Sequence, residues 1–188
     1  MHPTVCDTLA DIAQNSIEAG AKDIEIRLAR NGRETIVSVR DNGCGMTAEQ
    51  KRRAEDPFYT APGKHPKRKV GLGLPFARMT AEQCGGRWTL ESEPGKGTFV
   101  EFSMAADNVD APPLGDVPAT LVGLMAWDGD REIRVVREDL GGTYEVTRGE
   151  LAEALGGDWS DAGTLALAKQ FFSSNEDEIQ QRGESWRN

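Results

Sequence analysis

Cysteine is scarce and long apolar runs are missing from this chain of 188 residues. Its three cysteines, Cys6, Cys44 and Cys84, show no CxxC spacing, which argues against a disulfide framework and against a zinc site. The longest uncharged apolar stretch is about ten residues, near Ala119–Trp127, whereas a membrane-spanning helix needs about 20. The first residues show no pattern of a secretion signal. We therefore expect a cytoplasmic protein without a membrane segment.

Basic charge is also in short supply, and it is distributed unevenly. Residues 1–106 carry 15 basic and 14 acidic side chains, whereas residues 107–188 carry 7 basic and 17 acidic ones, which together give the net charge of −9. Nucleic-acid binding needs a basic footprint, so we expect no nucleic-acid partner. The acidic second region either keeps the protein soluble or provides a docking surface for a basic partner.

Hydrophobic spacing in the first hundred residues changes between the helical period and the strand period. Gly, Asn and Pro interrupt both patterns at residues 41–45 and 57–71, which we expect to be loops. This order predicts a mixed α/β layer, with helices on one face of a mostly antiparallel sheet. The expected helices cover residues 7–19 and 73–84, and the expected strands cover 23–30, 34–40, 87–92 and 98–104.

The second region predicts a smaller α+β unit. It contains an apolar helix at 121–127, strands near 131–137 and 143–146, a helix opened by the capping box Thr147–Glu150, and a last helix over 161–173. The polar end beyond this helix is expected to be frayed. The predicted organisation is a domain at 1–106, a proline-rich linker at 107–118, an acidic α+β extension at 119–175 and a disordered tail at 176–188.

Two short segments have residues suited to binding a flat polar ligand. Asp11 and Asn15 are four residues apart, so they share one face of the first helix. Taken alone, such a pair is typical of the solvated polar face that any surface helix has. The segment Asp41-Asn-Gly-Cys-Gly-Met46 directly follows a strand. Its glycines allow a backbone to approach a ligand closely, and Asp41 can accept a hydrogen bond from an exocyclic amine. Taken alone, this segment is more typical of an ordinary turn.

Two further segments are rich in glycine. Val70-Gly-Leu-Gly-Leu74 opens a helix, and free amides at a helix N-terminus favour phosphate. It is neither a Walker A motif, since no GK[ST] follows, nor a dinucleotide fingerprint, since no parallel βαβ unit surrounds it. Gly95-Lys-Gly-Thr98 leads into a strand, where the simplest interpretation is a hairpin turn.

In this order, the segments resemble the boxes of the GHKL superfamily, which includes gyrase, the large heat-shock chaperones, histidine kinases and mismatch-repair ATPases. The resemblance covers about residues 7–104 and implies the Bergerat ATP-binding fold, a two-layer α/β sandwich. The first helix resembles the N box, Asp41–Met46 the first glycine box, Asp56–Thr60 the phenylalanine box, Val70–Leu74 the second glycine box, and Gly85–Phe99 the end of a histidine-kinase catalytic domain.

The resemblance implies ATP and Mg2+ as ligands and assigns roles to individual residues. Asn15 would hold Mg2+, Asp41 would accept from the adenine amino group, and Thr98 would lie near the adenine together with a water. The loop Thr60–Lys69 would be the ATP lid, whose basic residues either meet phosphate or are simply solvated. The remaining positions implied for the nucleotide are Gly43, Gly45, Met46, Lys69, Gly71, Leu72, Gly73 and Leu74.

The sequence departs from the family pattern at the general base. Hydrolysing members have Glu where this chain has Asp11, and Asp is one methylene shorter. A base must reach the attacking water, and an error of about 1 Å can cost about a hundredfold in rate, so we expect slow hydrolysis. Glu18 and Ala19 replace the Lys and Tyr common in histidine kinases, and only ten residues precede Asp11, so we expect no phosphoacceptor helix here.

These observations predict an ATP-binding regulatory protein in which nucleotide orders the lid and thereby controls an unidentified protein partner. Two alternatives remain open at this point. One is a protein kinase that transfers the γ-phosphoryl group to Ser or His of a partner, as anti-sigma kinases and histidine kinases do. The other is a plain, slow ATPase.

Overall fold

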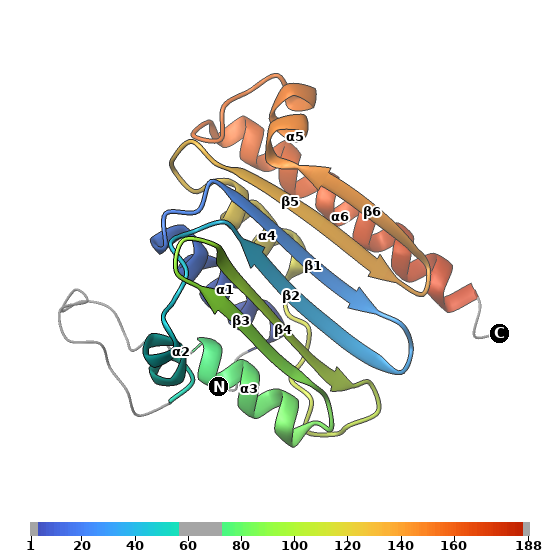
Figure 1. The fold of residues 1–188 in the computed structure, drawn as a ribbon. Helices are drawn as coiled ribbons and strands as arrows, with labels where there is room; N and C mark the ends of the chain where they lie inside the picture. The colour runs from blue at the N-terminus through green and yellow to red at the C-terminus, as the bar shows by residue number, and fades with distance from the viewer. Residues whose placement is uncertain (1–3, 57–72, 186–188) are drawn as a thin grey trace.

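The computed structural model describes residues 4–56 and 73–185, which contain one six-stranded sheet (Figure 1). The strand order is β3-β4-β2-β1-β5-β6. All neighbours are antiparallel except β1 and β5, which are parallel. The strands are β1 Asp23–Arg30, β2 Glu34–Asp41, β3 Trp88–Glu93, β4 Gly97–Ala105, β5 Glu132–Asp139 and β6 Gly142–Thr147.

A layer of helices covers one face of this sheet (Figure 1). Helix α1 packs on β1 and β2, α3 packs on β3 and β4, and α5 and α6 cover β5 and β6, while α4 lies between α1 and α6. The short helix α2 contacts β3. The helices are α1 Val5–Glu18, α2 Ala48–Ala54, α3 Gly73–Gln83, α4 Val117–Met125, α5 Arg148–Leu155 and α6 Ala162–Ser185.

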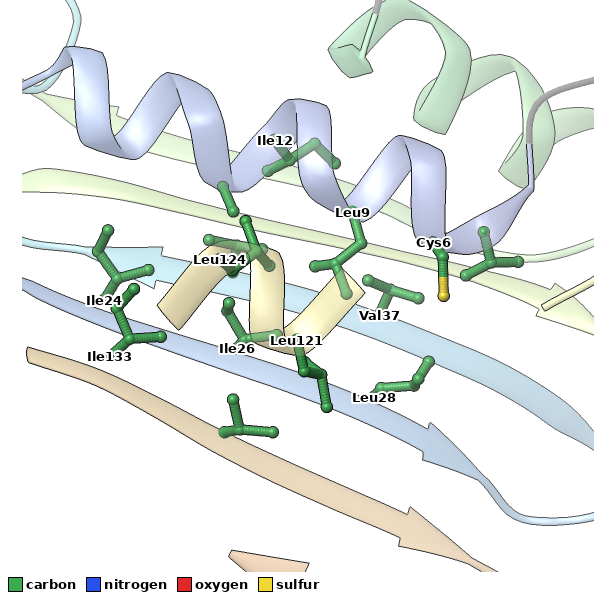
Figure 2. Packing of buried hydrophobic residues seen from close by; sticks show 14 of the residues in the cluster. Cys6, Leu9, Ile12, Ile24, Ile26, Leu28, Val37, Leu121, Leu124 and Ile133 are labelled. Atoms are coloured by element: carbon green, nitrogen blue, oxygen red, sulfur yellow. The ribbon is translucent and has the colours of Figure 1, made fainter. Parts of the chain in front are cut away.

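The core lies between these two layers. Alternate residues of β1 point into it, so Ile26 is fully buried while Glu25 stays exposed on the open face. Figure 2 shows Leu9 of α1 and Leu121 of α4 above the strands that carry Ile26 and Val37. Each such buried side chain stabilises the fold by roughly 1.5–3 kcal/mol. The predicted α/β two-layer fold with a mostly antiparallel sheet and helices on one face is confirmed.

Most predicted elements appear with ends shifted by a few residues, but α2 was not predicted. It begins at a capping box in which Thr47 and Gln50 bond reciprocally, a pattern that the sequence contained. No residue of α2 is buried, so it lacks the hydrophobic periodicity from which helices are recognised. The predicted capping box at Thr147 does open α5.

The C-terminal region continues the main sheet. β5 pairs in parallel with β1, with Ile24 opposite Ile133, and both side chains belong to the one buried cluster. The preceding linker is held as well, because the carbonyls of Pro113 and Leu114 accept from the amides of Val5 and Cys6, each at 3.0 Å. These carbonyls satisfy donors that the start of α1 leaves free. The division into separate domains at residue 106 remains a prediction.

The end of the chain corrects one prediction. A helix ending at 173 and a disordered tail from 176 were expected, but α6 runs on to Ser185. Glu176 explains this, because it is only 5% exposed and forms an ion pair at 3.0 Å with Arg137 of β5, which is 1% exposed. The Tyr144 hydroxyl donates to the same carboxylate at 2.9 Å. Hydrophobic periodicity could not reveal a helix face that is anchored by a buried charge.

Candidate functional site

Asp41, the last residue of β2, holds a buried carboxylate in a fixed orientation. It is 8% exposed. The Ser16 hydroxyl of α1 donates to its Oδ2 at 2.6 Å, and the Gly43 amide donates to its Oδ1 at 2.8 Å. Each carboxylate oxygen can accept a second hydrogen bond. The group therefore fits a ligand that supplies a donor, such as an exocyclic amine.

The loop after Asp41 fits closely between α1 and the β3–β4 hairpin. A Cβ at Gly43 would lie 2.8 Å from the Ala19 Cβ, and a Cβ at Gly45 would lie 1.9 Å from the Glu93 carbonyl oxygen. Gly45 also has φ of +65°, which disfavours other residues. The Cys44 amide donates to the Ala19 carbonyl at 2.9 Å. Any side chain at either glycine would push this loop away from the two elements that hold it.

Thr98 is paired with Asp41 across the sheet, and Ser92 links Thr98 to Met46. Thr98 is the residue opposite Asp41 in the β2–β4 pairing. The Ser92 hydroxyl of β3 lies 2.9 Å from Thr98 Oγ1 and accepts from the Met46 amide at 2.8 Å. The structure thus brings together three residues that the sequence analysis assigned to the nucleotide. It adds Ser16 and Ser92, which no sequence pattern marks, because only contacts between elements identify them.

Helices α1 and α3 meet at the second group of predicted residues. Gly73 opens α3, and a Cβ added there would lie 2.7 Å from the Asp11 Cβ. Desolvation raises the pKa of the Asp11 carboxyl, and the nearby Asp7 carboxylate raises it further. The Asn15 side chain, one turn along the same helix, is partly buried. Asp11 and Gly73 therefore meet where α1 and α3 pack. Asn15 follows one helical turn later and Leu74 one residue later, and the first amides of α3 favour an anion.

Some predicted positions cannot be placed. Lys69, Gly71 and Leu72, like the lid Thr60–Lys69, lie outside the described residues. Within residues 4–56 and 73–185, no cluster of three or more His, Cys, Asp or Glu side chains is suited to a metal ion. A carboxamide oxygen such as that of Asn15 is nevertheless a suitable Mg2+ ligand, because this ion usually takes few protein ligands and completes its shell with phosphate oxygens and water.

Residues 3–108, more than half of the chain, match the family described as histidine kinase-, DNA gyrase B-, and HSP90-like ATPase. The chain belongs to this family, and its first part is a GHKL-superfamily ATP-binding domain. The order of its boxes and the two-layer fold agree with that assignment.

The chain is similar to the signal transduction histidine-protein kinase AfsQ2 of Streptomyces coelicolor, with 31% identity over 57% of this chain and 20% of that protein. It is 35% identical to the methanogenesis regulatory histidine kinase FilI of Methanothrix harundinacea, over 53% of this chain and 12% of that protein. Sporulation kinase C of Bacillus subtilis is 34% identical over 48% of this chain and 21% of its own length. The chain thus spans about a fifth or less of these curated relatives.

In the part of the chain that the structure describes, no helix has both the length and the apolar character needed to cross a bilayer.

Proposed function

We propose that this protein binds ATP together with Mg2+ and uses the bound state to control a protein partner, with little hydrolysis. The observation that carries the proposal is the Asp41 carboxylate, which is buried, held by Ser16 and Gly43, and still able to accept hydrogen bonds. Such a carboxylate stands next to a glycine loop and is joined to α1, the helix that also contacts the start of α3. This arrangement suits a nucleotide that has an amino group at one end and phosphates at the other.

Each part of the site would then have a separate task. Asp41 would accept from the adenine amino group, and the close fit of Gly43 and Gly45 would let the loop backbone lie along the base. Asn15 would offer its oxygen to Mg2+, which neutralises phosphate charge when bound. The amides of Gly73 and Leu74, at the start of α3, would receive phosphate oxygens.

Slow hydrolysis is supported by the identity and position of Asp11. Its short side chain lies against the first residue of α3, so it extends less far toward the predicted phosphate position than Glu would. Weak hydrolysis is the property expected of a switch that holds its nucleotide. The nucleotide-dependent ordering of the lid Thr60–Lys69, which would transmit binding to the partner, remains a prediction about residues outside the described part.

Phosphoryl transfer to a partner is the second candidate. It is favoured by the similarity to proteins named histidine kinases, at 31–35% identity over about half of this chain. A transferred phosphoryl group would move from ATP to a Ser or His of the partner and leave ADP. A plain ATPase would instead transfer the group to water.

Incubation of the purified protein with γ-labelled ATP, with and without a cell lysate, distinguishes these functions. Retention of intact ATP supports the regulatory proposal, label on a second protein supports the kinase, and steady release of phosphate over many turnovers supports the ATPase. A pull-down with and without ATP then tests the partner. A partner whose capture does not change with ATP would contradict the switch.

A further inference from the structure

Ser92 connects the parts of the candidate adenine site through a single hydroxyl group. Its Oγ accepts from the Met46 amide at 2.8 Å, lies 3.0 Å from the Gly97 carbonyl and lies 2.9 Å from Thr98 Oγ1. The loop beside it is held to the same hairpin by the Gly95 amide, which donates to the Cys44 carbonyl at 2.8 Å. One side chain therefore joins the glycine loop, the β3–β4 turn and Thr98.

The directions of these hydrogen bonds follow from the number of protons. A serine hydroxyl has one proton to donate and can accept two hydrogen bonds. The Gly97 carbonyl can only accept, so the Ser92 proton goes to it. Ser92 must then accept from Thr98, whose own proton is used in that bond. The Thr98 oxygen is left with acceptor sites only.

Asp41, opposite Thr98 in the pairing of β2 with β4, is also an acceptor when ionised. Two neighbouring groups at this end of the candidate site therefore offer lone pairs and no proton. A 6-amino purine supplies protons to such a pair, directly or through a water. At the same position a 6-oxo purine presents a carbonyl oxygen, so acceptors face acceptors there. The proton of a 6-oxo purine lies on the neighbouring N1 atom.

We infer that Ser92 is a positioning residue that holds Thr98 as an acceptor and thereby selects a 6-amino purine over a 6-oxo purine. This inference rests on the proposed binding of ATP. It differs from a simple structural role, because Ser92 acts by fixing the direction of the Thr98 proton. Without the Ser92 hydroxyl, that proton is free to turn toward an oxygen at the 6 position.

The test compares the dissociation constants of Mg-ATP and Mg-ITP for the wild-type protein and Ser92→Ala. The two nucleotides carry an amino group and a carbonyl oxygen at the 6 position, and ITP also holds a proton on N1. The wild type should prefer ATP. In Ser92→Ala, binding of ITP should become tighter, and the preference for ATP should fall by about fivefold, the value of one hydrogen bond. General damage to the fold would weaken both ligands, so a gain in ITP binding cannot come from it.

Three further variants complete the experiment. Ser92→Thr keeps the hydroxyl and should keep the preference, and Ser38→Ala makes the same change as Ser92→Ala on the open face of β2 and should also keep it. In Thr98→Val the preference should fall, and adding Ser92→Ala to it should change the ratio no further, because Ser92 acts through Thr98.

Two results would overturn the role of Ser92 while leaving ATP binding intact. One is an ATP-to-ITP preference in Ser92→Ala equal to that of wild type. The other is a further fall in that preference when Ser92→Ala is added to Thr98→Val. If Ser92→Ala does not fold, Thr98→Val still decides, because an unchanged ratio there contradicts the inference. A folded wild type that binds neither nucleotide would overturn the proposed function, and the inference with it.

Discussion

The Ser16 hydroxyl donates to the Asp41 carboxylate over 2.6 Å and so joins α1 to the end of β2. Ser16 directly follows Asn15, the predicted magnesium ligand, and Asp41 is the predicted adenine ligand. The two ends of the proposed nucleotide site are therefore linked by one buried hydrogen bond. This relationship explains why a helix and a strand that are distant in sequence can bind one ligand.

Replacing Asp41 with Asn should weaken ATP binding by about tenfold to a hundredfold, the range for a hydrogen bond to a charged group. The amide would present a donor where the adenine amino group needs an acceptor. Equilibrium titration measures the effect. Asp128→Asn, the same change in an exposed loop, is the control and should bind like wild type. Equal affinity in Asp41→Asn would remove Asp41 from base recognition.

Replacing Asn15 with Ala should weaken binding of ATP in the presence of Mg2+ more than in EDTA, because the lost oxygen serves the metal rather than the base. Gln14→Ala removes a neighbouring carboxamide that instead bonds to exposed Glu18 at 2.8 Å, and it should have no effect. An equal loss of ATP affinity in Mg2+ and in EDTA would contradict the role of Asn15 as a metal ligand.

Asp11 should determine the slow rate of ATP hydrolysis. Asp11→Asn should lower phosphate release, because an amide cannot accept the proton of the attacking water. Asp11→Glu should raise it, because the longer side chain reaches further. Phosphate release under saturating ATP measures both. A rate in Asp11→Asn equal to that of wild type would exclude Asp11 from the chemistry.

The same residue predicts a dependence of stability on pH. Partial desolvation raises the pKa of folded Asp11 above its ordinary value of 3.8 although the residue is exposed. A stabilising contribution, kept small by solvent screening, is therefore present below that value and is lost as pH rises through the folded pKa. Ionised Asp11 therefore costs stability at about pH 7. Asp11→Asn should unfold at a higher urea concentration than wild type there, and the difference should shrink toward about pH 4. A constant difference across this range would refute the linkage.

Glu176 should be essential to the C-terminal half of α6. Glu176→Ala leaves the Arg137 guanidinium buried without its main partner, which should lower the free energy of unfolding by about 3–5 kcal/mol. Glu178→Ala breaks an exposed pair with Arg182 and should cost under about 1 kcal/mol. Urea unfolding distinguishes the two. Equal small losses would indicate that residues beyond 173 do not pack as described.

Much of the fold was predictable because its signals are local. Strict alternation of Ile24, Ile26 and Leu28 defined β1 with its observed ends, since a strand buried on one face must alternate. Likewise, Asp41 and the glycines after it stood out because a loop that approaches another backbone closely has few allowed residues. Neither inference needed knowledge of any distant contact.

What could not be predicted depends on contacts between distant segments. The length of α6 depends on a charge on β5 that Glu176 meets across 39 positions. Ser92 looked like an ordinary strand residue until its neighbours on β4 and in the glycine loop were placed around it. Polar residues buried by pairing carry no periodic signal, so their partners appear only in the folded chain.

The most direct test of this account is an isothermal titration of the folded wild-type protein with ATP in magnesium buffer. The account predicts saturable binding at one site per chain, with affinity that falls when EDTA removes the metal. No measurable binding, by heat or by competition with a fluorescent ATP analogue, would contradict the central claim that Asp41 and Asn15 hold the two ends of a nucleotide.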